Sequence, residues 1–213
     1  MRLFKRGPAI WAALALLTLA SELGLSEVPD VGPLLAKVVV PLVACGLLYA
    51  AAAADRGHRP QLAYAIAAFR ARGGAIIAIV VASLITFAAE AFTAWWIADA
   101  NLLTYASSSQ ELSSVAIAGI YAIGVLASLP FTFVPFHVLF ERVPAAVAFA
   151  ASWNAFILNL APLLVYAVAS LVLLGFGLVT MGLGLILALP LWAASSYVAW
   201  KDVFGVREAP GSE

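Results

Sequence analysis

The sequence contains few charged residues: 10% of its 213 residues are Asp, Glu, Lys or Arg, whereas 65% are hydrophobic. Soluble domains carry about 25% charged and about 45–50% apolar residues, so a chain of this composition cannot hide its apolar side chains from water. Acidic and basic residues balance at 11 each, so no net charge favours a nucleic-acid partner. We therefore expect an integral membrane protein that has lipid as its solvent.

Cysteine and histidine are almost absent as well. Cys45 is the single cysteine, which excludes an internal disulfide and any site built from several cysteines. Two histidines leave little room for a histidine-based metal cage. The sequence also lacks a glycine-rich phosphate loop and the HExxH and GxSxG motifs. We therefore expect no enzymatic activity, no catalytic residue, no cofactor and no metal ion.

Long apolar stretches account for most of the chain, at residues 8–25, 33–54, 74–98, 113–139, 156–175 and 178–200. Each is close to the ~20 residues that a helix needs to cross a bilayer. The predicted fold class is therefore all-α, a polytopic transmembrane bundle of six spans. Residues 1–204 are expected to form a single transmembrane domain, followed by a short tail at 205–213. If the first stretch is instead a cleaved secretory signal, five spans remain in the same orientation.

The basic residues predict the orientation of these spans. All except Lys37 fall on one side if six helices alternate: Arg2, Lys5, Arg6, Arg56, Arg59, Arg70, Arg72, Arg142, Lys201 and Arg207. The opposite connections carry only carboxylates, at Glu22, Glu27, Asp30, Asp99 and Glu111. Because Lys and Arg accumulate in cytoplasmic loops, both termini are expected in the cytoplasm. Trp95 and Trp96 then fit an outer aromatic belt and Trp200 an inner one.

Two of the inner connections have related patterns. Pro60 opens a segment that ends at Arg70, Pro144 opens one that ends at Asn154, and each leads into a span containing Val-Ala-Ser-Leu. The first segment has apolar residues at helical spacing, at Leu62, Ile66 and Phe69. This pattern predicts short helices on the inner membrane surface before the third and fifth spans. The likeness indicates either a duplicated unit or chance in an alanine-rich sequence.

Two charged residues lie inside predicted spans, where charge is costly and often functional. Lys37 lies about one turn below the outer surface in the second span, and Glu90 lies at a similar depth in the third. A Lys37–Glu90 ion pair is therefore expected. It could gate an outer cavity or bind a charged ligand, but it could also only join two helices, or Lys37 could extend to the lipid headgroups.

Pro130 and Pro135 make the fourth span the best candidate for a broken helix, because each proline removes a backbone hydrogen bond. Transporters use such breaks for ion sites, although proline is also common in membrane helices. At the inner end of the same span, His137 and Glu141 stand four residues apart on one helix face. With His58 they form a weak polar cluster. A metal site would need a third converging ligand, so an interfacial histidine beside a solvated carboxylate is the plainer interpretation.

The closing segment, Ser195-Ser196-Tyr197-Val198-Ala199-Trp200-Lys201-Asp202-Val203-Phe204, resembles that of six-span bacterial inner-membrane proteins of unknown function. These proteins are distantly similar to the membrane domain that precedes some glycerophosphodiester phosphodiesterases. The segment from Pro60 to Arg70 also resembles their inner surface helix. The resemblance implies a bacterial inner membrane and transfers no catalytic residue. Phosphodiesterase activity is not expected, since the soluble catalytic domain is missing.

Two functions follow from these features. The scarcity of polar groups in the spans and the helices rich in small residues favour a non-enzymatic scaffold, assembly or regulatory component of a membrane complex. The alternative is a small transporter or lipid-handling permease, indicated by Lys37, Glu90 and the prolines of the fourth span. The expected partners are membrane lipids, with other membrane proteins or a second copy of the chain as further options.

Overall fold

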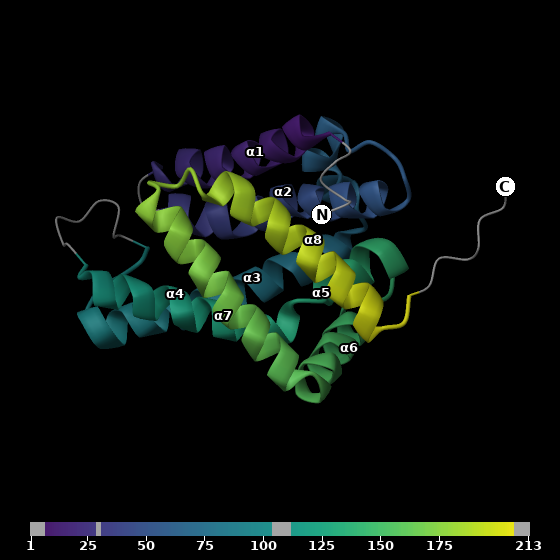
Figure 1. The fold of residues 1–213 in the computed structure, drawn as a ribbon. Helices are drawn as coiled ribbons and strands as arrows, with labels where there is room; N and C mark the ends of the chain where they lie inside the picture. The colour runs from purple at the N-terminus through teal and green to yellow at the C-terminus, as the bar shows by residue number, and fades with distance from the viewer. Residues whose placement is uncertain (1–6, 29–30, 104–111, 207–213) are drawn as a thin grey trace, which may run out of the picture.

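The computed structural model describes residues 7–28, 31–103 and 112–206, and these residues form helices and turns without any strand (Figure 1). The α-helices are α1 (Pro8–Ser26), α2 (Gly32–Asp55), α3 (Gly73–Ala98), α4 (Ser114–Ser128), α5 (Val134–Phe136), α6 (Ala145–Leu158), α7 (Leu160–Val179) and α8 (Leu185–Val203). The predicted all-α class is thus confirmed. Several residues used to predict the orientation lie outside the described residues, namely Arg2, Lys5, Arg6, Asp30, Glu111 and Arg207, as does most of the expected tail.

Five segments are long and apolar enough to cross a membrane. They are α1, α2, α3, the stretch Ser114–Glu141 that begins with α4, and α7. The helix α8 is not among them, so the sixth span stays a prediction. These are the properties of a multi-pass membrane protein, because helices satisfy their own backbone hydrogen bonds in lipid.

The boundary between the last two helices differs from the predicted one. The stretch predicted at 178–200 is divided by a turn at residues 180–184, where Met181 and Gly182 have φ angles of 51° and 89°. Left-handed conformations end an α-helix, and glycine adopts them without strain. The turn moves α8 toward the C-terminus, so Lys201 and Asp202 lie within the helix rather than after it.

The fourth apolar stretch is broken at its prolines. After α4 the chain forms a 3-10 turn at Leu129–Phe131, the short helix α5, and a π-helical turn at His137–Glu141. The Ser152 hydroxyl, from α6, spans the break: it donates to the Pro130 carbonyl at 2.7 Å and accepts from the Phe133 amide at 3.2 Å. Ser152 thus pairs backbone groups that a continuous helix would satisfy itself.

The two segments predicted as inner surface helices take different forms. The first consists of 3-10 helices at Leu62–Ile66 and Ala68–Arg70, whereas the second is the regular helix α6. In each, one side is buried, at Ala68 and Ser152, and large apolar side chains such as Phe69 and Trp153 remain exposed. The first segment packs closely on α2, because a Cβ added to Gly46 would lie 2.8 Å from the Tyr64 carbonyl oxygen.

Aromatic side chains join the end of α8 to the broken segment. Trp200 stacks on Phe136 with ring centroids 5.4 Å apart, and Tyr197 packs against the same ring. Trp200 is only 4% exposed, whereas Trp96 is 75% exposed. The inner aromatic belt predicted for Trp200 is therefore wrong: its ring lies in the core, because α8 turns this face toward Phe136.

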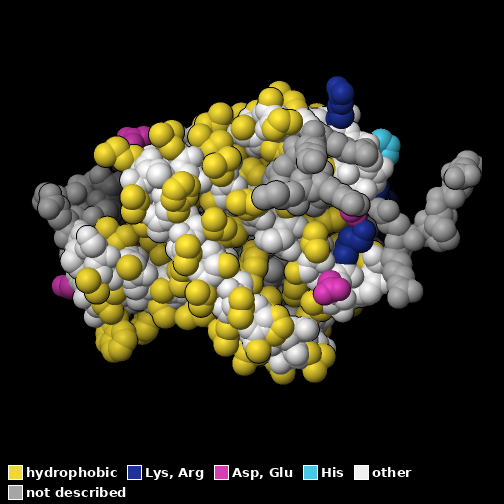
Figure 2. All heavy atoms as spheres, viewed as in Figure 1, with side chains coloured by type: hydrophobic (Ala, Val, Ile, Leu, Met, Phe, Trp, Pro, Cys, Tyr) yellow, Lys and Arg dark blue, Asp and Glu magenta, His cyan; other side chains and the backbone are white. Residues whose placement is uncertain are grey.

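The basic side chains of the described residues gather at one end of the bundle, while hydrophobic side chains cover the middle of the visible face (Figure 2). This end is formed by the C-terminal ends of α2 and α8, the start of α3 and the π-helical turn. Apart from Lys37, it holds the Lys and Arg residues that the structure describes, namely Arg56, Arg59, Arg70, Arg72, Arg142 and Lys201. We call it the basic end.

Candidate functional site: a polar cleft inside the bundle

A cleft of about 410 Å³ lies inside the bundle. Its walls come from α2, α3, α7, α8 and the broken fourth stretch. Most of the lining is apolar, and it includes Pro41, which lies inside the continuous helix α2, and Pro135 of the broken fourth stretch. Ligand pockets commonly combine an apolar wall with a few polar groups, and helix bundles form them between facing helices.

Charged residues lie at the end of the cleft that is opposite the basic end. Lys37 Nζ lies 3.8 Å from Glu22 Oε1 and 4.0 Å from Glu90 Oε2, so a single ammonium group is shared by two carboxylates. The side chains are partly exposed, at 28% for Lys37 and 18% for Glu90. We call these residues the Lys37 triad. With all groups ionised its charge is −1, so one negative charge remains available to a ligand.

The surroundings of the triad hold its members in place. Lys37 Nζ lies 5.5 Å from the centre of the Phe87 ring, within the range of a cation–π interaction. The Glu90 carboxylate lies over Gly124 of α4, where an added Cβ would overlap with it. Glu90 therefore depends on a glycine in the facing helix for its position.

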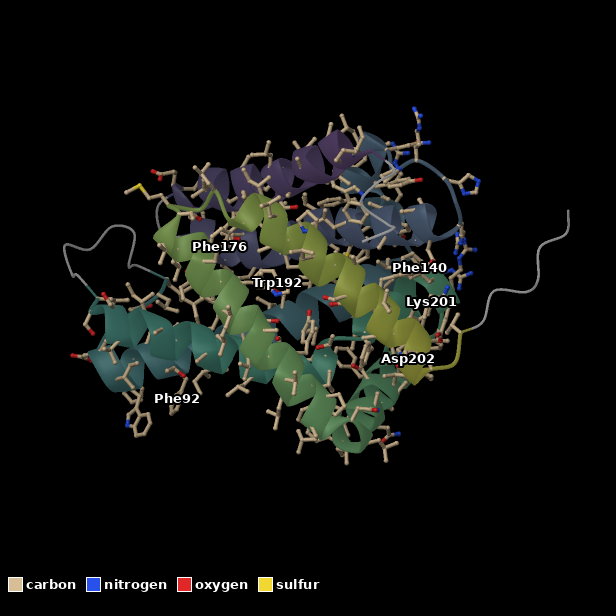
Figure 3. The ribbon with its side chains drawn as sticks, in the orientation of Figure 1. Phe92, Phe140, Phe176, Trp192, Lys201 and Asp202 are labelled. Atoms are coloured by element: carbon tan, nitrogen blue, oxygen red, sulfur yellow. The ribbon has the colours of Figure 1, made fainter. Side chains whose placement is uncertain are left out.

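Neutral polar groups line the opposite part of the cleft. The hydroxyls of Tyr166 on α7 and Ser196 on α8 are hydrogen bonded at 2.8 Å. Trp192, near the middle of α8 (Figure 3), lines the same cleft, and its indole Nε1–H is buried without a partner among the described residues. A buried donor without an acceptor is costly, so Trp192 is suited to receive an acceptor atom of a ligand.

The predicted inner polar cluster is only partly assembled. His137 Nδ1 and Glu141 Oε2 lie 2.8 Å apart, and the His137 ring packs on Phe204. Within the described part of the chain, no group of three His, Cys, Asp or Glu residues could hold a metal ion, so His58 does not complete a site with this pair. His137 and Glu141 do not line the cleft. Of the prolines predicted to break the fourth span, Pro135 lines it and Pro130 does not.

No family model, curated protein or solved structure matches the chain. The resemblance of the closing segment to six-span bacterial membrane proteins therefore stays a prediction. A function for this chain has to be argued from the cleft and its residues.

Sequence reasoning selected Lys37, Glu90 and Pro135 but missed Glu22 and the other polar residues of the cleft. Glu22 was assigned to an outer connection, although it lies within α1 and faces Lys37. Tyr166, Trp192 and Ser196 were hidden in spans that are apolar on all sides. A tyrosine and a serine in predicted spans are a signal that could have drawn attention to α7 and α8, because buried hydroxyls need partners.

Proposed function

We propose that the protein is a small transporter of the bacterial inner membrane, which takes its solute into the polar cleft. The observation that carries this proposal is the Lys37 triad, two members of which, Lys37 and Glu90, line a cleft of about 410 Å³. Charged side chains among membrane helices usually face one another or a water-filled cavity, and they often mark a solute pathway. A simple helix-joining ion pair would need neither a second carboxylate nor a cavity beside it.

The proposal includes a topology of six spans with both termini in the cytoplasm. In this arrangement α8 is the last span and the basic end faces the cytoplasm, in accordance with the positive-inside rule. The Leu62–Arg70 segment and α6 lie at the inner surface, where exposed side chains such as Phe69 and Trp153 would contact lipid. The triad then lies toward the outer surface, where a solute would enter.

The structure of the fourth stretch supports transport more than scaffolding. Broken helices expose backbone groups beside a cavity and allow parts of a bundle to move against each other. Pro135 places such a break in the wall of the cleft. A scaffold has no need of an interrupted helix beside a cleft, so this feature supports the transport hypothesis and not the scaffold hypothesis.

Native mass spectrometry of protein extracted gently from its own membrane tests the proposal. We expect a small molecule to be retained by the wild type and lost from Glu90→Gln, which removes the net charge of the triad. Glu27→Gln is the matched control, because Glu27 caps the end of α1 and does not line the cleft. A stoichiometric protein partner, with no small molecule retained, would contradict transport and favour a scaffold.

A second pair of variants separates position from charge. Gly124→Ala keeps every charge but pushes the Glu90 carboxylate away from α4, so it should also lose the retained molecule. Gly119→Ala, on the same helix, places a methyl group 3.4 Å from Ile97 and should keep it. Retention by both glycine variants would mean that the position of Glu90 does not matter.

A further inference from the structure

A second cavity of about 170 Å³ adjoins the cleft. It lies between the beginning of α7 and the end of α8, which diverge from their common turn (Figure 1). Thr132, Tyr166 and Ser196 line both the cleft and this cavity. The two spaces thus meet at these side chains.

A hydrogen bond between Tyr166 and Ser196 joins α7 to α8 where the two spaces meet. Their hydroxyls are 2.8 Å apart, and Thr132 lies beside them from the broken fourth stretch. A single hydrogen bond between neutral groups contributes only about 1 kcal/mol, so it can open and close readily. The Tyr166–Ser196 hydrogen bond is therefore weak enough to act as a gate between the two spaces.

Each of the two spaces is lined by a carboxylate, Glu90 in the cleft and Asp202 in the second cavity. The cleft ends at the triad, whose charge is −1 with all groups ionised, and Asp202 is the carboxylate that lines the second cavity. Lys201 precedes Asp202 at the end of α8 (Figure 3), but its ammonium lies 2.5 Å from Asp55 and does not line the cavity. Beside each of these carboxylates a cation is favoured over an anion.

We infer that the cleft and the second cavity form one pathway for a small organic cation, closed by the Tyr166–Ser196 hydrogen bond. The inference rests on the proposed transport function and adds the charge of the solute and the position of the gate. The cation would enter at the triad, pass the hydroxyls of Tyr166 and Ser196, and leave beside Asp202.

Cysteine labelling in proteoliposomes tests the pathway. In a Cys45→Ala background, Ser83→Cys places a thiol in the cleft and Ala199→Cys places one in the second cavity. The probes are two membrane-impermeant methanethiosulfonates, one with a trimethylammonium group and one with a sulfonate group. We expect the cationic probe to label both thiols at least about tenfold faster, each from its own side of the membrane. Val172→Cys, on the exposed face of α7, is the control that neither probe should label.

The gate is tested by adding Tyr166→Phe to the Ala199→Cys protein. The cationic probe, applied on the side of the triad, should then label the thiol introduced by Ala199→Cys roughly fivefold faster. This is the factor expected for the loss of one hydrogen bond. Tyr121→Phe is the matched control, since Tyr121 lines neither space. Ser196→Ala removes the same hydrogen bond and replaces Tyr166→Phe if that variant fails to fold.

Three outcomes would overturn the inference. Equal labelling by both probes would refute the selection for cations, and an unchanged rate in both gate variants would refute the gate. Absence of labelling at Ser83→Cys and Ala199→Cys would refute the pathway itself. A molecule retained by the wild type in native mass spectrometry would still support a solute site in the cleft, so the inference and the transport function fail separately.

Discussion

Replacing Ser152 by alanine removes the side chain that joins both sides of the broken fourth stretch. Ser152 is fully buried, and its hydroxyl binds the Pro130 carbonyl at 2.7 Å and the Phe133 amide at 3.2 Å. Its replacement leaves the buried Phe133 amide and the partly buried Pro130 carbonyl without this partner. Interhelical hydrogen bonds in membranes contribute about 0.6–1.7 kcal/mol each, and an unsatisfied buried group costs about 1–3 kcal/mol. We expect Ser152→Ala to lower the free energy of unfolding by about 2 kcal/mol.

Reversible unfolding in mixed detergent micelles measures this difference. Ser195→Ala is the matched control, because the Ser195 hydroxyl is exposed and donates to the Trp192 carbonyl of its own helix at 3.0 Å. Its effect should remain within about 0.5 kcal/mol. Ser152→Cys retains nearly the same volume with a weaker donor and should fall between the wild type and Ser152→Ala. If Ser152→Ala were as stable as the wild type, packing alone would hold the break and the reasoning from hydrogen bonds would be refuted.

Two further substitutions test how α2 is held. Gly46→Ala should destabilise the protein by about 1–3 kcal/mol in the same assay, since the new methyl group meets the backbone of the Leu62–Ile66 segment, whereas Gly175→Ala has open space and should be neutral or slightly stabilising. Equal effects of both would contradict the close approach. Asp55→Asn removes the ion pair with Lys201 and should cost up to about 1 kcal/mol at low salt. That loss should shrink at high salt, and a salt-independent loss would show that the pair does not act through its charge.

The predicted break at Pro130 and Pro135 and the pairing of Lys37 with Glu90 show what local sequence can reveal. A proline lacks a backbone donor wherever the chain folds, so each proline in a span is a candidate break; the two in the fourth stretch interrupt it, whereas Pro41 and Pro190 lie inside continuous helices. Lys37 and Glu90 are rare charges at similar depths in neighbouring spans, which leaves few alternative partners. Both predictions needed only the linear position of a residue and the thickness of the membrane.

Other features depended on how the helices rotate about their axes. Trp200 was expected at a lipid interface, but α8 turns its ring toward Phe136. Glu22 was not expected to share the Lys37 ammonium group, because its rotational position on α1 is not evident from spacing. The segment before α3 was expected as one short helix, and it consists of two 3-10 helices that approach Gly46 closely.

The sequence by itself determined that the chain is helical and that several of its helices are apolar enough to cross a membrane. Its composition has more apolar side chains than a soluble domain of this size can bury, and an α-helix pairs most of its own backbone groups, as lipid requires. Only the tertiary structure decided which polar side chains meet in the cleft and at the gate. In a soluble helix an apolar stripe marks the inward face, but these helices are apolar on all sides, so packing alone selects the face that each one turns inward.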